Sequence, residues 1–450
     1  MSGHSILGRV LATLIIAAYI RLPAHGLPSY ARQTGQKCSA CHVGGNWPQL
    51  TPWGRFFKLS GYTAGESAFD KEGFNFVPVG MFGQAGVTWA ANPNDATGQS
   101  IIPNTGHPEV YGFTGEVGTK IAPFAGIFYE YELNNTFPGW KGASGPADIR
   151  AVHFFNLASN ELLVGIDTNN VPTVQDVWNS TPDWSFPFFG SPEALEGPAS
   201  PMIMSLDGMV GGIGAYALLN RQIYVEASFY RVGTGLYRWM NGGTNFHAAD
   251  QNYLKGENPY WRAYWTRQRG PQSFMVGTFG MRANVYPDSA NPNGPADVFT
   301  DYGFDSQYQY LASVHKVTLR ESYIYEHQSW DAGFPLGKSD TQKGNLKALN
   351  LNGSYAHDDT WSLHAGYNMT NGNNNAALYA ITSPTGDELT ASPKTTGYTL
   401  EADRKITQNI QLTAQYRGFL QFNGLRHNID GLGRSASDNN TLGLSVFFAF

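Results

Sequence analysis

Residues 361–369 read Trp361-Ser362-Leu363-His364-Ala365-Gly366-Tyr367-Asn368-Met369, and their pattern decides the fold. The odd positions are apolar, and the even positions are polar or small. A period of two is typical of a β-strand with one apolar and one wet face, because successive side chains point to opposite sides. The same alternation recurs at 222–229 and at 410–417. The chain is therefore predicted to be built of amphipathic strands.

The connections distinguish a membrane barrel from a soluble sandwich, which would show the same alternation. About sixteen such segments follow from Phe76 onward, each near the ~10 residues that a tilted membrane strand needs. Short links are centred near 122–123, 159–160, 220–221, 270–271, 313–314, 357–358 and 407–408. They alternate with long links near 91–108, 133–148, 168–210, 231–259, 287–297, 328–345, 370–396 and 423–440. Short turns on one rim and long loops on the other are the plan of an outer-membrane barrel.

The C-terminal strand supports the same interpretation. Its apolar positions alternate up to a terminal phenylalanine, through Leu442, Leu444, Val446, Phe448 and Phe450. A terminal phenylalanine is the usual mark recognised by outer-membrane assembly machinery. The mean hydropathy of −0.31 would suggest a soluble protein, but alternating lipid-facing and lumen-facing residues average out in that index. We therefore expect contact with outer-membrane lipids and no nucleic-acid partner.

The N-terminus resembles a secretory signal over residues 1–26. His4 and Arg9 come before or at the start of an apolar run at 10–18, and Ala24 and Gly26 suit a cut before Leu27. The alternative is an uncleaved anchor, but the run is too short for a bilayer of about 30 Å. The sequence thus predicts export.

Cys38-Ser39-Ala40-Cys41-His42 contains both cysteines of the chain. Two thiols three apart followed by histidine are the attachment pattern of c-type haem, in which the sulfurs add to the vinyl groups and the histidine is an axial ligand of the iron. A redox dithiol or half a zinc site are the alternatives. Zinc would need further ligands nearby, and the next histidine is His107. We expect one covalent haem c on Cys38 and Cys41, with His42 on the iron.

The haem segment, residues 27–75, is too short for an independent core. We therefore expect the barrel to complete its pocket, with the segment plugging the periplasmic mouth or the lumen, which a sixteen-stranded barrel is wide enough to admit. Thr51 with Pro52 predicts the start of a short helix. The apolar residues of this helix, Phe56, Phe57 and Leu59, could pack on the haem. Its two basic residues, Arg55 and Lys58, could pair with a haem propionate or be solvated.

The motifs over residues 31–62 resemble the fused monohaem cytochrome–porins of the bacterial outer membrane. They are Ala31-Arg32-Gln33-Thr34-Gly35, the Cys-x-x-Cys-His motif, and Pro-x-Leu-x-x-x-Gly-Arg-x-Phe-Lys-x-x-Gly-Tyr at 48–62. The prototype is the iron-oxidising cytochrome of acidophilic and neutrophilic iron bacteria. The resemblance implies an iron(II) oxidoreductase that takes electrons from extracellular Fe(II). It also implies a periplasmic acceptor, either a copper protein such as rusticyanin or a soluble cytochrome c.

The second axial ligand is not evident, because no methionine or histidine lies between His42 and Met81. Met81, Met275 and Met281 share the apolar parity of their strands and should face lipid. His364 shares a face with polar residues and is a candidate distal ligand, the alternative being a solvated lumen histidine. Three methionines close the longest loop and could fold inward, namely Met202, Met204 and Met209. A five-coordinate haem is a further alternative.

An acidic stretch suggests where a cationic donor could arrive. Residues 151–220 contain no lysine or arginine. Their acids are Glu161, Asp167, Asp176, Asp183, Glu193, Glu196 and Asp207. Such a loop would attract Fe(II), or it could be an acidic loop without a role.

Together these observations predict an all-β chain with a signal peptide (1–26), a monohaem cytochrome c segment (27–75) and a porin-like barrel of about 16 antiparallel strands (76–450). The leading functional hypothesis is an outer-membrane conduit from extracellular Fe(II) through a barrel-embedded haem. Because iron needs only to approach the haem edge, no catalytic protein acid or base is expected. The alternatives are outward electron transfer to an external acceptor, a diffusion porin with a vestigial haem plug, and a soluble periplasmic cytochrome.

Overall fold

The computed structural model describes residues 28–450 except 46–47, 70–72, 74, 96, 103, 137–138, 182–185, 189–196, 198 and 241–250. The predicted signal peptide and cleavage site lie outside the described residues. None of the helices in the described ranges has the length and apolar character needed to cross a bilayer.

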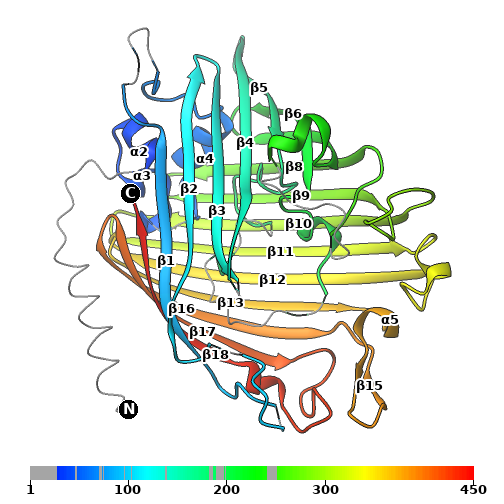
Figure 1. Ribbon diagram of the computed structural model, residues 1–450. Helices are drawn as coiled ribbons and strands as arrows, with labels where there is room; N and C mark the ends of the chain where they lie inside the picture. The colour runs from blue at the N-terminus through cyan, green and yellow to red at the C-terminus, as the bar shows by residue number, and fades with distance from the viewer. Residues whose placement is uncertain are drawn as a thin grey trace.

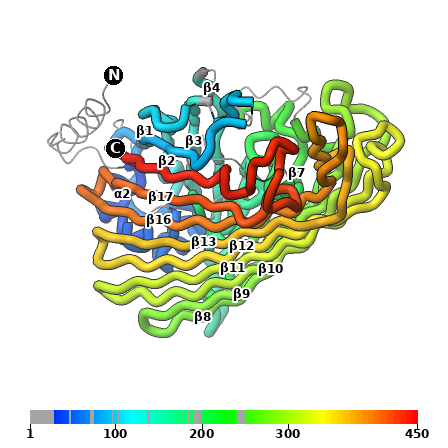
Figure 2. Tube along the Cα trace, turned by 90° about the horizontal axis from the view of Figure 1, so that it is seen from below, coloured from blue at the N-terminus to red at the C-terminus, as the bar shows by residue number. Residues whose placement is uncertain are grey.

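A closed antiparallel barrel of sixteen strands makes up most of the molecule, in the order β1-β18-β17-β16-β13-β12-β11-β10-β9-β8-β7-β6-β5-β4-β3-β2 (Figures 1 and 2). Its strands are β1 (Val79–Ala90), β2 (Pro108–Ala122), β3 (Ala125–Thr136), β4 (Gly139–Leu157), β5 (Asn160–Asn169), β6 (Val210–Leu219), β7 (Ile223–Val232), β8 (Asn258–Arg269), β9 (Gln272–Val285), β10 (Asp297–Leu311), β11 (His315–Ser329), β12 (Lys343–His357), β13 (Trp361–Gly372), β16 (Thr395–Thr407), β17 (Ile410–Gln421) and β18 (Thr441–Ala449). The predicted fold class is confirmed.

Shorter elements lie before and between these strands. The N-terminal segment contains α2 (Ser29–Thr34), α3 (Cys38–Cys41), the 3-10 turn η1 (Val43–Gly45) and α4 (Pro52–Leu59). The long loops carry η3 (Met202–Met204), η4 (Gly235–Met240), η5 (Phe334–Leu336), α5 (Ala376–Tyr379), the hairpin of β14 (Ile381–Thr382) and β15 (Glu388–Thr390), and η6 (Ala436–Asn439).

Strand pairing between the two ends of the chain closes the barrel. The Met81 N–H donates to the Phe450 carbonyl at 2.9 Å, and the Phe450 N–H donates to the Met81 carbonyl at 2.7 Å. All seven predicted short links are tight turns between paired strands. One predicted long link is wrong, because β3 and β4 stay paired from Tyr131↔Ser144 out to Thr136↔Gly139 and form an extended hairpin there.

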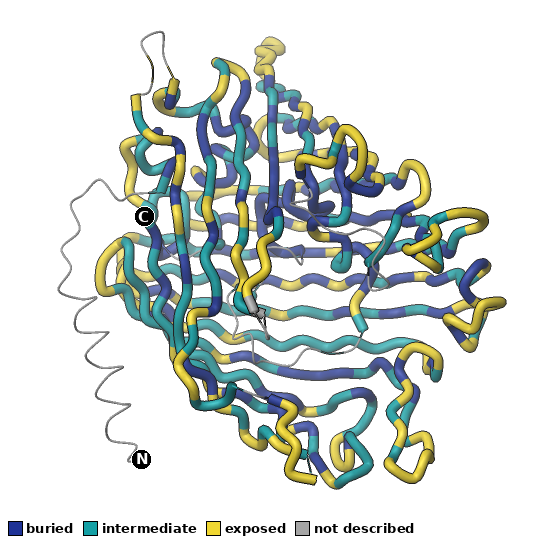
Figure 3. Tube along the Cα trace, in the orientation of Figure 1, coloured by how far each residue is buried: buried dark blue, intermediate teal, exposed yellow. Residues whose placement is uncertain are grey.

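The two faces of the strands follow the predicted alternation in most of the barrel. Trp361 and Leu363 face outward with 49% and 55% of their surface exposed, and Ser362 between them is buried. Met81 also faces outward, as expected for a lipid-facing residue. Figure 3 shows that exposed residues gather mainly in the turns and loops at the strand ends.

The predicted orientation of Met275 and Met281 is wrong, because both side chains face inward and are fully buried. Met281 belongs to an apolar cluster that joins β9 to η3, and Met202 of the longest loop packs in the same cluster. The lumen is filled with protein here, so apolar side chains on the inward face of the strand are not exposed to water. With Phe274 and Val276 exposed on the outer face, both faces of β9 are apolar and hydrophobicity cannot tell them apart.

The longest loop begins with a segment that folds into the lumen. Residues 169–181 are all buried. Asp176 lies 2.9 Å from the Arg262 guanidinium, which also contacts Asp305 at 2.6 Å. The predicted acidic outer surface is therefore corrected in part, because Asp167 and Asp176 lie inside the barrel, where buried charges need partners.

Candidate functional site

The Cys-x-x-Cys-His motif forms a single helical turn followed by a reversal of the chain. Cys38–Cys41 is α3, and the His42 N–H donates to the Cys38 carbonyl at 2.9 Å. On a helix, positions three apart lie on one face, so the two sulfurs point to the same side. His42 then pairs with Leu50 in an antiparallel bridge. Both thiols are free and half-buried.

The second motif holds α4 against this turn. Thr51 caps α4, as predicted, by accepting the Gly54 N–H at 3.2 Å, and its own hydroxyl donates to the Ala40 carbonyl at 2.6 Å. Any side chain at Gly54 would collide with the Cys41 carbonyl. The glycine of the motif is thus required for close packing of the two helices.

Hydrogen bonds join the N-terminal segment to the barrel wall near the short turns. The Lys120 N–H donates to the Gln33 side chain at 2.8 Å, and the Lys405 ammonium donates to the Gly44 carbonyl at 2.8 Å. Deeper in the lumen, the Tyr62 hydroxyl donates to Asp148 at 2.6 Å. The segment therefore sits inside the short-turn end of the barrel, the end that faces the periplasm in outer-membrane barrels.

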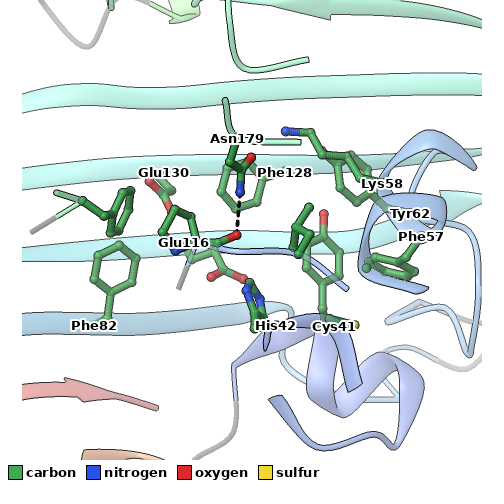
Figure 4. Close-up of a pocket in the computed structure, with 15 residues that line it drawn as sticks. Cys41, His42, Phe57, Lys58, Tyr62, Phe82, Glu116, Phe128, Glu130 and Asn179 are labelled. Carbon is green, nitrogen blue, oxygen red and sulfur yellow. Dashed lines mark hydrogen bonds between the residues drawn. The ribbon is translucent and has the colours of Figure 1, made fainter. Parts of the chain in front are cut away.

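A cavity lies between this segment and the barrel wall (Figure 4). About 170 Å³ of its volume admits the centre of a water molecule, and the cavity is partly open to solvent. The segment contributes Tyr30, Cys41, His42, Pro48, Leu50, Gly54, Phe57, Lys58 and Tyr62. The wall and the inward loop contribute Phe82, Glu116, Phe128, Glu130, Asn179 and Phe188.

The His42 imidazole is held in a form suited to metal binding. Burial, with the nearby Lys405 charge, lowers the pKa of His42 to about 3, and a hydrogen bond to the Pro48 backbone acts in the opposite direction. Proline offers only a carbonyl, so the imidazole is the donor in that bond. This fixes the tautomer whose other nitrogen carries a lone pair, as in metal-ligating histidines.

The two thiols do not resemble a reactive dithiol. Burial raises the pKa of Cys41 to about 11 and also raises the pKa of Cys38. Redox-active cysteines have lowered pKa values instead. Within the described ranges, no further Cys, His, Asp or Glu completes a cluster of three possible metal ligands with these thiols. The donor set and the aromatic cavity therefore fit a covalently attached haem better than zinc.

The predicted haem-packing residues divide between two sides of α4. Phe57 lines the cavity, and Lys58 does too. Phe56 lies on the other side, with the Arg221 guanidinium 4.2 Å from its ring centre. Arg55 points away from the cavity and donates to Gln309 of β10 at 2.7 Å, so it anchors the segment. The Lys58 ammonium donates to the Val174 carbonyl of the inward loop, so the structure shows neither basic residue directed at a propionate.

The wall residues of the cavity were missed in the sequence. Glu116 and Glu130 are directly opposite each other on β2 and β3, and Phe128 lies two residues before Glu130. All three side chains occupy positions that face the lumen. The alternation of side chains along each strand would have identified these positions once it was known which face of the strand points inward. Which strands flank the plug is set by the closure of the barrel, for which the local sequence has no signal.

The candidate distal ligands do not line this cavity. His364 lies in a smaller neighbouring cavity, 3.1 Å from Asp403. Met202 is folded inward against β9 and β10, and Met81 faces outward. Among the described residues that line the cavity there is neither a methionine nor a second histidine.

Comparisons with known proteins bear on the barrel. No protein-family profile matches this chain, and neither does any curated protein sequence. OprB of Pseudomonas putida has a similar structure, with 11% identity, a TM-score of 0.50, and coverage of 83% of this chain and 93% of that one. An anion-selective porin from Comamonas acidovorans is 12% identical, with a TM-score of 0.43 and coverage of 83% and 99%. The chain folds as a porin-like outer-membrane β-barrel.

Proposed function

We propose that the protein is an outer-membrane c-type cytochrome that takes electrons from extracellular Fe(II) and passes them to a periplasmic acceptor. The observation that carries the proposal is the single-turn Cys-x-x-Cys-His helix, packed by Gly54 against α4 and facing a cavity lined by aromatic rings. In this assignment Cys38 and Cys41 hold one haem c through thioethers, and His42 is its axial ligand. The haem supplies a one-electron carrier.

The chain's own residues supply position and environment. Tyr30, Phe57 and Phe128 line the cavity with aromatic rings. Oxidation of Fe(II) to Fe(III) releases one electron and no proton, so no side chain is needed as acid or base. The short-turn position of the segment is where a soluble cytochrome c or a copper protein would collect the electron.

The test is a visible spectrum of the purified, haem-loaded outer-membrane protein before and after anaerobic addition of Fe(II). We expect a reduced c-type spectrum at the pH of the organism's habitat. A Cys41→Ser variant should carry little covalent haem, and a Ser39→Ala variant, which alters the spacer only, should match the wild type. A haem that stays oxidised in excess Fe(II) would overturn the proposal, and its measured potential would show whether outward transfer is the better assignment.

A diffusion porin with a vestigial plug is the second candidate, favoured by the likeness of the barrel to OprB. Against it, residues 169–181 and the N-terminal segment both occupy the lumen. Planar-bilayer conductance separates the two. A large open channel in the intact protein would favour the porin.

A further inference from the structure

We propose that His364, Glu401 and Asp403 form a binding site for a divalent first-row metal cation inside the barrel. The three residues come from β13 and β16, which are neighbours in the wall (Figure 1). His364 pairs directly with Glu401, and Ser362 pairs with Asp403, so all three ligands occupy inward positions. Only the naming of Fe(II) as the natural occupant rests on the proposed function.

The ligand atoms are close enough to share one ion. A nitrogen of His364 and one carboxylate oxygen from each acid all lie within 4.8 Å of one another. Ligands bound at ~2.0–2.2 Å lie at most roughly 4.4 Å apart, so side-chain shifts of tenths of an ångström would complete the site. Imidazole with carboxylates is a set that suits Fe(II), Mn(II), Co(II) and Zn(II).

The imidazole is buried without a hydrogen-bond partner at Nδ1. Only 8% of the His364 side chain and 3% of the Asp403 side chain is exposed. Neither ring nitrogen has a partner of hydrogen-bonding geometry, although Nε2 is 3.1 Å from Asp403 Oδ2. The ring of Phe186 stacks on the imidazole with centroids 5.5 Å apart and holds its plane. A buried ring nitrogen aimed at two carboxylates is the arrangement that a cation would satisfy.

Both carboxylates of the site accept hydrogen bonds from neutral side chains of β17. Asp403 accepts from the Thr413 hydroxyl at 2.6 Å, and Glu401 accepts from the Gln415 amide at 2.6 Å, both neutral donors. Arg320 lines the same small cavity but donates to the Asn179 carbonyl at 2.7 Å.

Lys405, the nearest lysine along β16, donates its ammonium to the Gly44 carbonyl at 2.8 Å. Each of the two cations near the site has a backbone oxygen as its hydrogen-bond partner, and the Lys405 charge also acts on Asp403. Asp403 is buried and Glu401 is half-buried, and a cation bound between them would balance their negative charge.

The site borders the cavity assigned to the haem. Pro48 and Phe188 line both cavities. A cation held by His364 would therefore be separated from the cavity of His42 by one layer of side chains. This position gives the proposed electron donor a binding site next to its acceptor.

The experiment is a Co(II) titration of the detergent-purified, haem-loaded protein, read by the d–d absorption difference and repeated with Zn(II) as competitor. We expect one Co(II) per chain. His364→Ala, Asp403→Asn and Glu401→Gln should each weaken binding by more than the roughly 10–100-fold lost with an outer-shell partner. His427→Ala removes an exposed loop histidine and should leave the affinity unchanged.

The outcomes separate the site from the proposed function. Unchanged Co(II) affinity in His364→Ala and in the conservative Glu401→Gln variant, with heat-modifiable gel migration intact, would overturn the site. Failure of Fe(II) to reduce the haem while stoichiometric Co(II) binding persists would overturn the function and leave the site standing. Haem reduction that slows in His364→Ala but not in His427→Ala would support both.

Discussion

Replacing Arg55 with alanine should release the N-terminal segment from the barrel. The side chain is buried, and its Nη1 donates to the Leu50 carbonyl at 2.8 Å and to the Gln309 side chain at 2.7 Å. The guanidinium carbon lies 3.7 Å from the centre of the Trp178 ring. Gln309 belongs to the wall and Trp178 to the inward loop, so two of these three interactions dock the segment.

The expected loss follows from the two docking interactions. A hydrogen bond from a charged donor contributes about 1.5–3 kcal/mol. A desolvated cation–π contact contributes about 1–2 kcal/mol. The Leu50 bond is internal to the segment and is left out. A total of about 2.5–5 kcal/mol corresponds to docking weakened by roughly 60- to 4,000-fold at ~1.4 kcal/mol per tenfold.

Limited proteolysis of the folded barrel measures the release, and single-channel conductance gives a second readout. Cleavage within residues 28–75 should be faster in Arg55→Ala, and conductance should rise as the lumen opens. Arg231→Ala is the matched control, because that exposed arginine pairs with Glu257 at 3.4 Å, away from the segment, and should contribute less than about 1 kcal/mol. Equal protease resistance and equal conductance in the two variants would refute the docking role of Arg55.

Gly54→Ala should lower covalent haem content, because the added methyl group separates α4 from α3; haem absorbance per protein measures this, and Gly115→Ala, where there is room for a Cβ, should behave as wild type. Asp305→Ala removes one of two carboxylates from buried Arg262 and should lower the unfolding temperature, by less than the loss of a sole partner because Asp176 remains; an unchanged unfolding temperature would contradict this. Deleting Phe450 removes its two backbone hydrogen bonds to Met81 at the end of the β1–β18 ladder and should reduce the yield of heat-modifiable barrel; an unchanged yield would contradict this.

The barrel was predictable because lipid imposes a rule on every strand. Trp361 and Leu363 must be apolar where they face lipid, and short turns leave no room for other connections, so alternation and link length sufficed. The rule fails where the lumen is also apolar. Met281 packs in a cluster with Met202, and Met275 packs in another with Trp178, both partners belonging to the long loop that comes much earlier in the chain. No local pattern marks those contacts.

The candidate site divides in the same way. Cys38, Cys41 and His42 are adjacent in sequence, so their chemistry could be identified from spacing alone. Glu116 of β2 and Phe128 of β3 line the same cavity as the N-terminal segment only because the closed barrel places these strands around it. His364 was correctly predicted to face the lumen. That Asp403 lies beside it could be learned only from the register in which β13 pairs with β16.

The filling of the lumen and the presence of a redox motif support each other. A solute channel requires continuous water, yet Asn169 to Thr181 are buried inside the barrel and the Cys-x-x-Cys-His turn occupies its short-turn end. An electron requires no such path, only carriers and donors held close together in a fixed geometry. Under the proposed function, the inward packing of η3 and of residues 169–181 fixes the wall against which the N-terminal segment is held, and it removes no path that an electron needs.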